Sequence, residues 1–161
     1  LNRREVVSRR HAAGEHRIIS RLAAEADPKA LGGKNLADVL ATALRISTKD
    51  AKGRITHAEL LGPRTAITGE PLPPELPNVG AAQRRGDIGA EHLARIEKFF
   101  HELPHRIDYP TREAAEADLA RAASGLGPEQ FGQAADRLAL LLNQDGDLPE
   151  GVSDVLCSCG S

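Results

Sequence analysis

Apolar side chains recur at helical spacing along most of the chain. Over residues 2–26 they fall three or four positions apart with arginines between them, which predicts one long amphipathic helix. Similar stripes, bounded by capping residues, glycines and prolines, predict further helices at 36–44, 48–61, 79–85, 90–103, 112–124 and 128–143. The predicted N-caps are Asn35, Ser47, Asn78 and Thr111. No segment shows sustained alternation of apolar and polar residues, so the pattern predicts an all-α fold, a multi-helix bundle.

A proline-rich connecting loop divides these helices into two halves. Residues 62–77 contain five prolines and two glycines, which favours an ordered or semi-rigid loop over a helix. Its length suits a domain boundary or a segment that wraps around a single domain. We expect one helical domain over 1–147, with this loop between its halves, and a disordered tail over 148–161.

Composition also favours helices over sheets. The chain is rich in Ala and Leu but has only three Phe, one Tyr and no Trp, whereas a sheet favours β-branched and aromatic residues. Its 161 residues match one ordinary domain. No apolar run approaches the roughly 18 residues of a membrane span, and no signal sequence is evident, so we expect a cytoplasmic protein. The absence of every Met indicates a fragment or a non-standard start codon.

The charges are unevenly distributed along the chain. Residues 1–60 carry 12 basic and 7 acidic side chains, while residues 61–161 carry 9 and 16, and the net charge is only −2. The first part is therefore suited to a polyanion that the second part would repel. Two parts that attract each other, or that are simply solvated, explain the same distribution as well.

One stretch carries more specific information about function. Residues 40–55 read LATALRISTKDAKGRI and resemble the helix-turn-helix pattern. Ala41 is small where the two helices would cross, and Ser47 would cap the second helix. The residues expected to fill the wedge between the helices are Leu40, Leu44, Ile46 and Ile55.

In such motifs the second helix lies in the major groove of DNA, and its N-terminal side chains face the base edges. The predicted contacts to DNA are made by Thr48, Lys49, Lys52 and Thr56, with Arg45 and Arg54 near phosphates. Two residues depart from the pattern. Arg45 stands where a left-handed turn prefers Gly, and Gly53 weakens the second helix, each at a cost of about 1 kcal/mol. A purely structural helical corner therefore stays open as the alternative.

The remaining candidate chemistry is weaker. Six histidines are scattered, and Pro104 breaks the helical register between His101 and His105, so we expect histidines at the surface rather than on a metal. The two cysteines near the C-terminus offer only two ligands, and the sequence DGD at 145–147 is at most half of a calcium loop. No residues assemble a nucleophile and a base. We therefore expect no catalysis, no cofactor, no bound metal and no small-molecule substrate.

Three segments resemble the mycobacterial 13E12 repeat family, which is built on domain of unknown function 222. They read AAEADPKALGGKNLADVLATALRIS, LGPRTAITGEPLPPELPNVGAAQRRGDIGAEHLARIEKFFHELP and GPEQFGQAADRLALLLNQDGD. The resemblance covers residues 2–147 and implies a helical region that precedes an HNH-type nuclease domain in complete family members. Compared with that pattern the chain is expected to be truncated at both ends, and it lacks the nuclease residues. The resemblance therefore implies a non-catalytic module.

Two functions follow from these observations. The first is a DNA-associated module that uses residues 40–57 and the arginine-rich first helix. The second is a helical interaction or dimerisation module, or a truncated remnant, without nucleic-acid contact; a homo-oligomer fits either. Binding that weakens steeply with salt distinguishes the first, because contacts to phosphates release counterions. An enzyme is the least favoured class, because no catalytic constellation is present.

Overall fold

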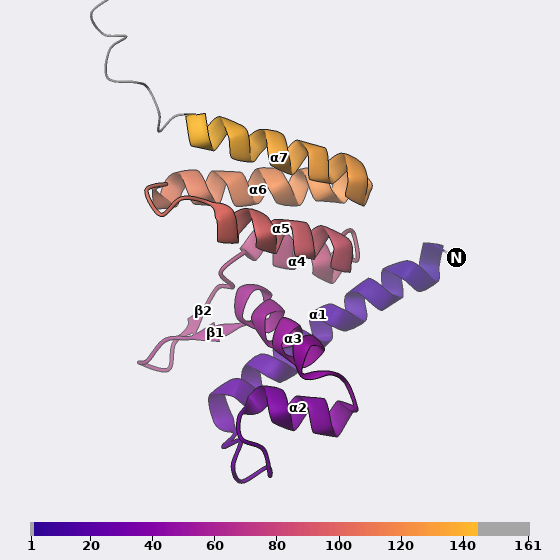
Figure 1. Ribbon diagram of the computed structural model, residues 1–161, viewed down its shortest axis with the longest axis vertical. Coiled ribbons are helices and arrows are strands. Elements are labelled where there is room, and N and C mark those ends of the chain that lie inside the picture. Colours follow the sequence, from indigo (N-terminus) through magenta and orange to yellow (C-terminus); the bar gives the residue numbers. More distant parts are fainter. Residues whose placement is uncertain (1, 145–161) are drawn as a thin grey trace, which may run out of the picture. The chain divides into compact units, whose positions relative to one another are not determined.

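The computed structural model describes residues 2–144, and 72% of these residues are helical. Helices dominate this part of the chain, with only two short strands among them (Figure 1). The elements are α1 (Asn2–Glu25), α2 (Leu36–Leu44), α3 (Thr48–Leu61), β1 (Arg64–Thr65), β2 (Pro71–Leu72), α4 (Pro77–Arg85), α5 (Ala90–Glu102), α6 (Tyr109–Gly125) and α7 (Pro128–Gln144). The predicted all-α fold is confirmed. The predicted tail over 148–161 lies outside the described residues.

The chain divides into two compact units. The first runs to Ala90 and holds α1 to α4 with both strands, and the second begins at Glu91, one residue into α5. The proline-rich segment 62–77 therefore belongs to the first unit, and the division falls after it. The expectation of a single domain over 1–147 stays a prediction.

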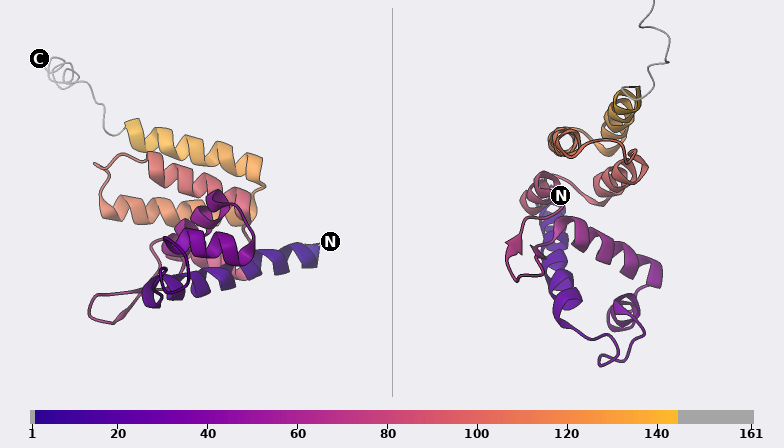
Figure 2. Two further views of the ribbon diagram at one scale, coloured as in Figure 1. Left: turned by 60° about the horizontal axis from the view of Figure 1, so that its bottom comes forward. Right: turned by 90° about the vertical axis from the view of Figure 1, so that its left-hand side faces the viewer.

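The first unit is built around α3. Both α1 and α2 pack on α3, and α1 also packs on α4 (Figure 2). Ala51 and Ala58 lie on one side of α3, two turns apart, and both are fully buried because the neighbouring helices approach closely there. Ile19, Ala37 and Leu40 complete this cluster. Small and aliphatic side chains thus build the core of a unit that has no aromatic ring except those of its histidines.

Two predicted helix starts are confirmed by their hydrogen bonds. The side chain of Asn35 accepts from the backbone N–H of Asp38 at 2.9 Å, at the start of α2. The hydroxyl of Ser47 accepts from the N–H of Asp50 at 3.1 Å, at the start of α3. Each bond satisfies one of the donors that a helix leaves free at its N-terminus.

Two other predicted caps are wrong. Helix α4 begins at Pro77 and places Asn78 inside the helix, because proline suits the first helical position, where no N–H is needed. Helix α6 begins at Tyr109, earlier than predicted. Its cap is Asp108, whose carboxylate accepts from the N–H of Thr111 at 3.2 Å.

The proline-rich segment forms a small hairpin. Strands β1 and β2 are antiparallel, with Arg64 opposite Leu72. Gly69 turns the chain with a φ of 89°, which favours glycine, and donates its N–H to the carbonyl of Ala66 at 2.9 Å. Each strand has two exposed residues, so no hydrophobic alternation is present from which the hairpin could have been predicted.

In the second unit, α5, α6 and α7 lie side by side (Figures 1 and 2). Helix α5 buries Leu93, Ile96 and Phe99, and Leu103, which follows the helix, is buried as well. Phe131 of α7 is completely buried, and its ring lies 5.5 Å from that of His92. The aromatic residues that the chain does have thus contribute to the core of this unit.

Candidate nucleic-acid interface

The turn between α2 and α3 has the left-handed backbone that a helix-turn-helix requires. Helix α2 ends at Arg45, which has a φ of 55° and a ψ of 43°. Its N–H and that of Ile46 both donate to the carbonyl of Ala41. The left-handed conformation therefore occurs at the position where the helix-turn-helix pattern prefers glycine, although arginine occupies it.

The wedge between the two helices is filled largely as predicted. Leu40 is buried, and Ile46 and Ile55 are half-buried against the core cluster of the first unit. Leu44 is an exception, because its side chain is exposed at the end of α2 and does not fill the wedge. The helix pair therefore depends on Ile55 from α3 and Ile46 from the turn.

The N-terminal half of α3 presents lysines and hydroxyls to solvent. Thr48, Lys49 and Lys52 are exposed, and Thr56 is half-buried. Within residues 2–144, neither Lys49 nor Lys52 forms an ion pair or hydrogen bond. Arg45 is likewise exposed and without a side-chain partner in this range. These side chains are therefore available to an anionic ligand.

Arg54 is engaged within the first unit. Its guanidinium donates to Glu15 of α1 at 2.5 Å and to Asp50 at 3.1 Å, and its side chain is one-third exposed. These two hydrogen bonds, that with Glu15 first, raise the pKa of Arg54 above its ordinary value. Arg54 thus connects α3 to α1, and a phosphate would have to compete with two carboxylates for it.

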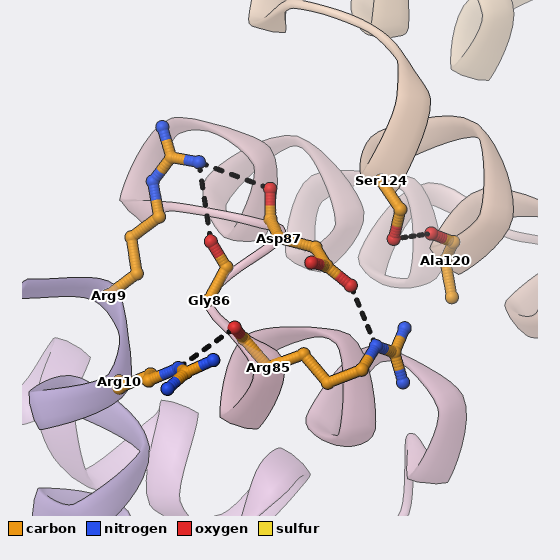
Figure 3. Close-up of polar contacts among 7 residues, drawn as sticks. All are labelled: Arg9, Arg10, Arg85, Gly86, Asp87, Ala120 and Ser124. Carbon is orange, nitrogen blue, oxygen red and sulfur yellow. Dashed lines mark hydrogen bonds and ion pairs between the residues drawn. The ribbon is translucent and has the colours of Figure 1, made fainter. Parts of the chain in front are cut away.

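Apart from Arg21, which pairs with Glu25 of the same helix at 3.1 Å, the arginines of α1 form two groups. Arg9 donates to the carbonyls of Gly86 and Asp87, and Arg10 donates to the carbonyl of Arg85 (Figure 3). These carbonyls lie at the C-terminal end of α4, where a helix leaves acceptors unpaired and attracts positive charge. Both arginines therefore hold α1 against α4.

The second group of α1 arginines is exposed. Arg3, Arg4 and Arg17 make no hydrogen bond or ion pair within the described part of the chain. Together with Lys49, Lys52 and Arg45 they contribute free positive charge to the first unit. The sequence indicated an arginine-rich helix but not that Arg9 and Arg10 are engaged, because the carbonyls that they contact lie at the C-terminal end of α4.

The expectation that the histidines lie at the surface is wrong for two of the six. His16 is only 5% exposed, between α1, α3 and α4, and neither ring nitrogen has a hydrogen-bond partner among residues 2–144. Its ring meets that of His57 edge to face, with 6.1 Å between centroids. Burial, and then repulsion from His57, lower the pKa of His16, against smaller opposing effects of Gln83 and Glu15.

The second buried histidine, His92, has a partner. Its Nε2 lies 2.9 Å from the carbonyl oxygen of Leu126. Among residues 2–144, no group of three or more His, Cys, Asp and Glu side chains is placed to hold a metal ion. The two cysteines and the DGD sequence lie outside the described residues. No helix in the same part of the chain has the length and apolar character needed to cross a membrane.

Comparison with known proteins identifies one family. The family described as "Domain of unknown function (DUF222)" matches residues 1–153. An uncharacterized protein of Mycobacterium tuberculosis is 47% identical over 147 residues, which is 91% of this chain and 32% of that protein. An uncharacterized protein of Mycobacterium bovis is 45% identical over 150 residues, or 93% of this chain and 33% of its own length. The chain thus spans about a third of the length of these relatives. No solved structure matches it significantly.

Proposed function

The chain belongs to the DUF222 family, and from this premise we propose that it is a DNA-associated module that contacts the duplex through the N-terminal half of α3. The observation that carries the proposal is the pair Lys49 and Lys52. Both are exposed, neither has a partner among residues 2–144, and both lie on the side of α3 away from buried Ala51 and Ala58. A helix held this way, with α2 behind it, matches the recognition helix of a helix-turn-helix.

The charge of the first unit supports the proposal. Residues 1–90 carry 15 basic and 10 acidic side chains, so that this unit is positive although the whole chain is not. Glu59 is exposed near the C-terminal end of α3 and would repel a phosphate. Contact is therefore expected along the first two turns of α3, where helix-turn-helix proteins meet the base edges.

The predicted contact residues differ in how available their side chains are to DNA. Lys49, Lys52 and Arg45 are free to meet phosphates, and Thr48 is exposed beside them. Thr56 is only half-buried, so its hydroxyl can reach solvent on the same side of α3. Arg54 would first have to leave Glu15 and Asp50, so we assign it the weakest contribution.

The role we propose is non-catalytic. The resemblance to the 13E12 repeat family implies an HNH-type nuclease domain after the helical region in complete members, and two thirds of the length of the relatives lies outside the match. A DNA-binding helical region would hold such a protein on its substrate. Divalent-metal-dependent cleavage of plasmid DNA by the purified chain, lost on substitution of one of its own histidines, would contradict the non-catalytic role.

Fluorescence anisotropy with a mixed-sequence duplex at several salt concentrations tests the DNA contact. We expect the parent to bind at low salt and to weaken steeply as salt rises, because phosphate contacts release counterions. Replacing Lys49 and Lys52 together by Ala should weaken binding and reduce the slope of log K against log salt by roughly 2, for two lost contacts.

The matched control replaces Lys29 and Lys34 by Ala. Both are exposed in the segment between α1 and α2, so the control removes the same charge from the same unit but away from α3. It should reduce the affinity much less than the α3 variant. Equal losses would indicate attraction by net charge alone. No binding by the parent at low salt would reject DNA association and favour the interaction module.

A further inference from the structure

One side of α1 carries a stripe of residues spaced three and four apart. Its members are Arg4, Val7, His11, Gly14, Ile18, Leu22 and Glu25. All are exposed except Leu22, which is half-buried and also packs against the core cluster of the first unit. Val7 is 51% exposed and Ile18 63%, whereas His16 and Ile19, on the other side of the helix, are buried. In Figure 2, α1 extends beyond the other elements of the first unit at its N-terminal end. An amphipathic helix normally buries its apolar residues, so the exposure of Val7 and Ile18 on this stripe indicates a contact.

Two shallow hollows lie along the stripe, one towards each end of α1. The first is lined by Arg3, Arg4, Val7, Ser8 and His11. The second is lined by Ile18, Arg21, Leu22, Glu25 and Ala26. Gly14 lies between them, and a Cβ atom at this position would meet no other atom within 4 Å. The stripe therefore offers an apolar hollow at each end and a small residue in the middle.

We propose that this stripe is the interface of a homodimer, in which two copies of α1 pack antiparallel and cross near Gly14. Six of the seven stripe residues form pairs about the midpoint between Gly14 and Glu15, and Gly14 itself falls opposite Glu15 of the other copy. Val7 and Leu22 are equally far from it along the chain, and so are Arg4 and Glu25. A two-fold axis at the midpoint therefore sets each residue against its counterpart from the other copy, as a closed dimer requires.

Apolar contacts form in both halves of this arrangement. Val7 of each copy enters the hollow beside Ile18 and Leu22 of the other, and His11 lies opposite Ile18. The absence of a side chain at Gly14 lets the two helix backbones approach closely at the crossing. Spacing of three and four residues keeps the same side of α1 in contact over its length.

Charge decides between antiparallel and parallel packing. In the antiparallel dimer, Arg4 of each copy meets Glu25 of the other, at both ends of the interface. Arg4 there joins the ion pair that Glu25 forms with Arg21 of its own helix at 3.1 Å. A parallel dimer would set Arg4 against Arg4 and Glu25 against Glu25, which is unfavourable. The stripe also carries exposed valine and isoleucine and a glutamate beside its arginine. It therefore fits a second copy of the chain better than DNA, which presents only negative charge along its backbone.

The interface is small, which sets the expected affinity. Residues 4–25 of a helix extend for about 33 Å, and a contact restricted to one helix face lies at the lower end of specific interfaces, near 1,200 Å² in total. We therefore expect a reversible dimer whose population depends on protein concentration in the micromolar range. The inference does not rest on the proposed DNA contact, because no residue of the stripe is among the proposed DNA contacts.

Sedimentation equilibrium of the whole 161-residue chain, without DNA and with a reductant to keep its cysteines reduced, tests the proposal. We expect a monomer–dimer equilibrium in the parent. Gly14→Leu should raise the dimer dissociation constant by at least about tenfold, because a bulky side chain separates the helices at their crossing. This variant also raises helix propensity, so circular dichroism should show no loss of helix. Ile18→Glu should have a similar effect on the dimer.

The control for Ile18→Glu is Leu140→Glu in α7, where the parent side chain is 60% exposed. It adds the same charge to an equally exposed apolar position, and we expect no change in the dimer. A charge exchange tests the orientation. Arg4→Glu and Glu25→Arg should each weaken the dimer, and the two together should restore it, because the opposite charges then face each other again.

The proposal is overturned by a parent that stays monomeric up to millimolar concentration. It is also overturned by a dimer that withstands both Gly14→Leu and Ile18→Glu, or that Leu140→Glu dissociates as readily. Failure of the double charge variant to recover association would reject the antiparallel arrangement. Since DNA is absent from these measurements, their outcome is separate from that of the binding experiment with Lys49 and Lys52.

Discussion

Arg45 holds a backbone conformation that side chains other than glycine seldom adopt. It is the one residue other than glycine with a positive φ among those described, and it ends α2 at the turn before α3. The left-handed conformation costs an L-residue with a Cβ atom roughly 1 kcal/mol. The turn therefore keeps a positive side chain at the edge of the proposed DNA-binding surface at some cost in stability.

Replacing Arg45 by Gly or by Ala should separate the effect of backbone strain on stability from the effect of the side-chain charge on DNA binding. We expect Arg45→Gly to raise the free energy of unfolding by about 1 kcal/mol, measured by urea denaturation, because glycine adopts this conformation without strain. Arg45→Ala removes the same charge but keeps a Cβ atom, so it should not stabilise the protein. Both variants should weaken DNA binding to the same extent. Equal stabilities for the two variants would contradict strain at this position.

For the helices, the sequence correctly predicted two starts that depend only on residues close by in the chain. Asn35 and Ser47 act as caps through bonds to residues three positions on, so local sequence is sufficient to place the starts of α2 and α3. The starts of α4 and α6 also depend on residues close by, Pro77 and Asp108. The prediction was wrong there because Asn78 and Thr111, which follow shortly after, are suitable capping residues as well. Boundaries of helices are the least certain part of any such prediction.

Contacts between helices could not be predicted from local sequence patterns. The ion pair of Arg54 with Glu15 joins residues 39 positions apart, and no spacing rule connects them. The burial of His16 likewise depends on α3 and α4, which follow it in the chain. The candidate contact residues were therefore proposed from sequence, whereas the availability of each of their charges required the fold.

His16, which is buried where α1 meets α3 and α4, should make the stability of the first unit sensitive to acid. The pKa of His16 lies below its ordinary value of 6.5, chiefly because of burial, so the unfolded state binds a proton more readily than the folded state. The stabilising contribution of the neutral ring is complete above about pH 6.5 and is lost as the pH falls towards the folded-state pKa. His57 and Glu15 are the titratable groups that influence this ring.

Urea denaturation of the parent between pH 8 and pH 5 measures this effect. We expect the free energy of unfolding to fall over the acidic part of the range, and His16→Leu to make the fall shallower, because the buried ring no longer takes up a proton on unfolding. His101→Leu, at an exposed position of α5, serves as the control. A parent and His16→Leu with the same pH dependence would show that His16 does not control it.

Over the whole molecule, two cores of different composition share one chain. The first is made of alanine and aliphatic residues around α3, and the second includes Phe99 and Phe131. The proposed DNA contact and the proposed dimer interface both belong to the first unit. The second unit carries the excess of negative charge, so it is not expected to contribute to binding of a polyanion.

A cavity in the second core tests whether the two units are separate folding units. Phe131 is completely buried, so Phe131→Ala should destabilise the second unit by about 3–5 kcal/mol, as in other cores that lose an aromatic ring. Hydrogen exchange read by mass spectrometry should show reduced protection in α5 to α7 and unchanged protection in α1 to α4. DNA binding should then persist. A uniform loss of protection through both units would instead mean that they unfold together, and the division at Glu91 would not be a division in stability.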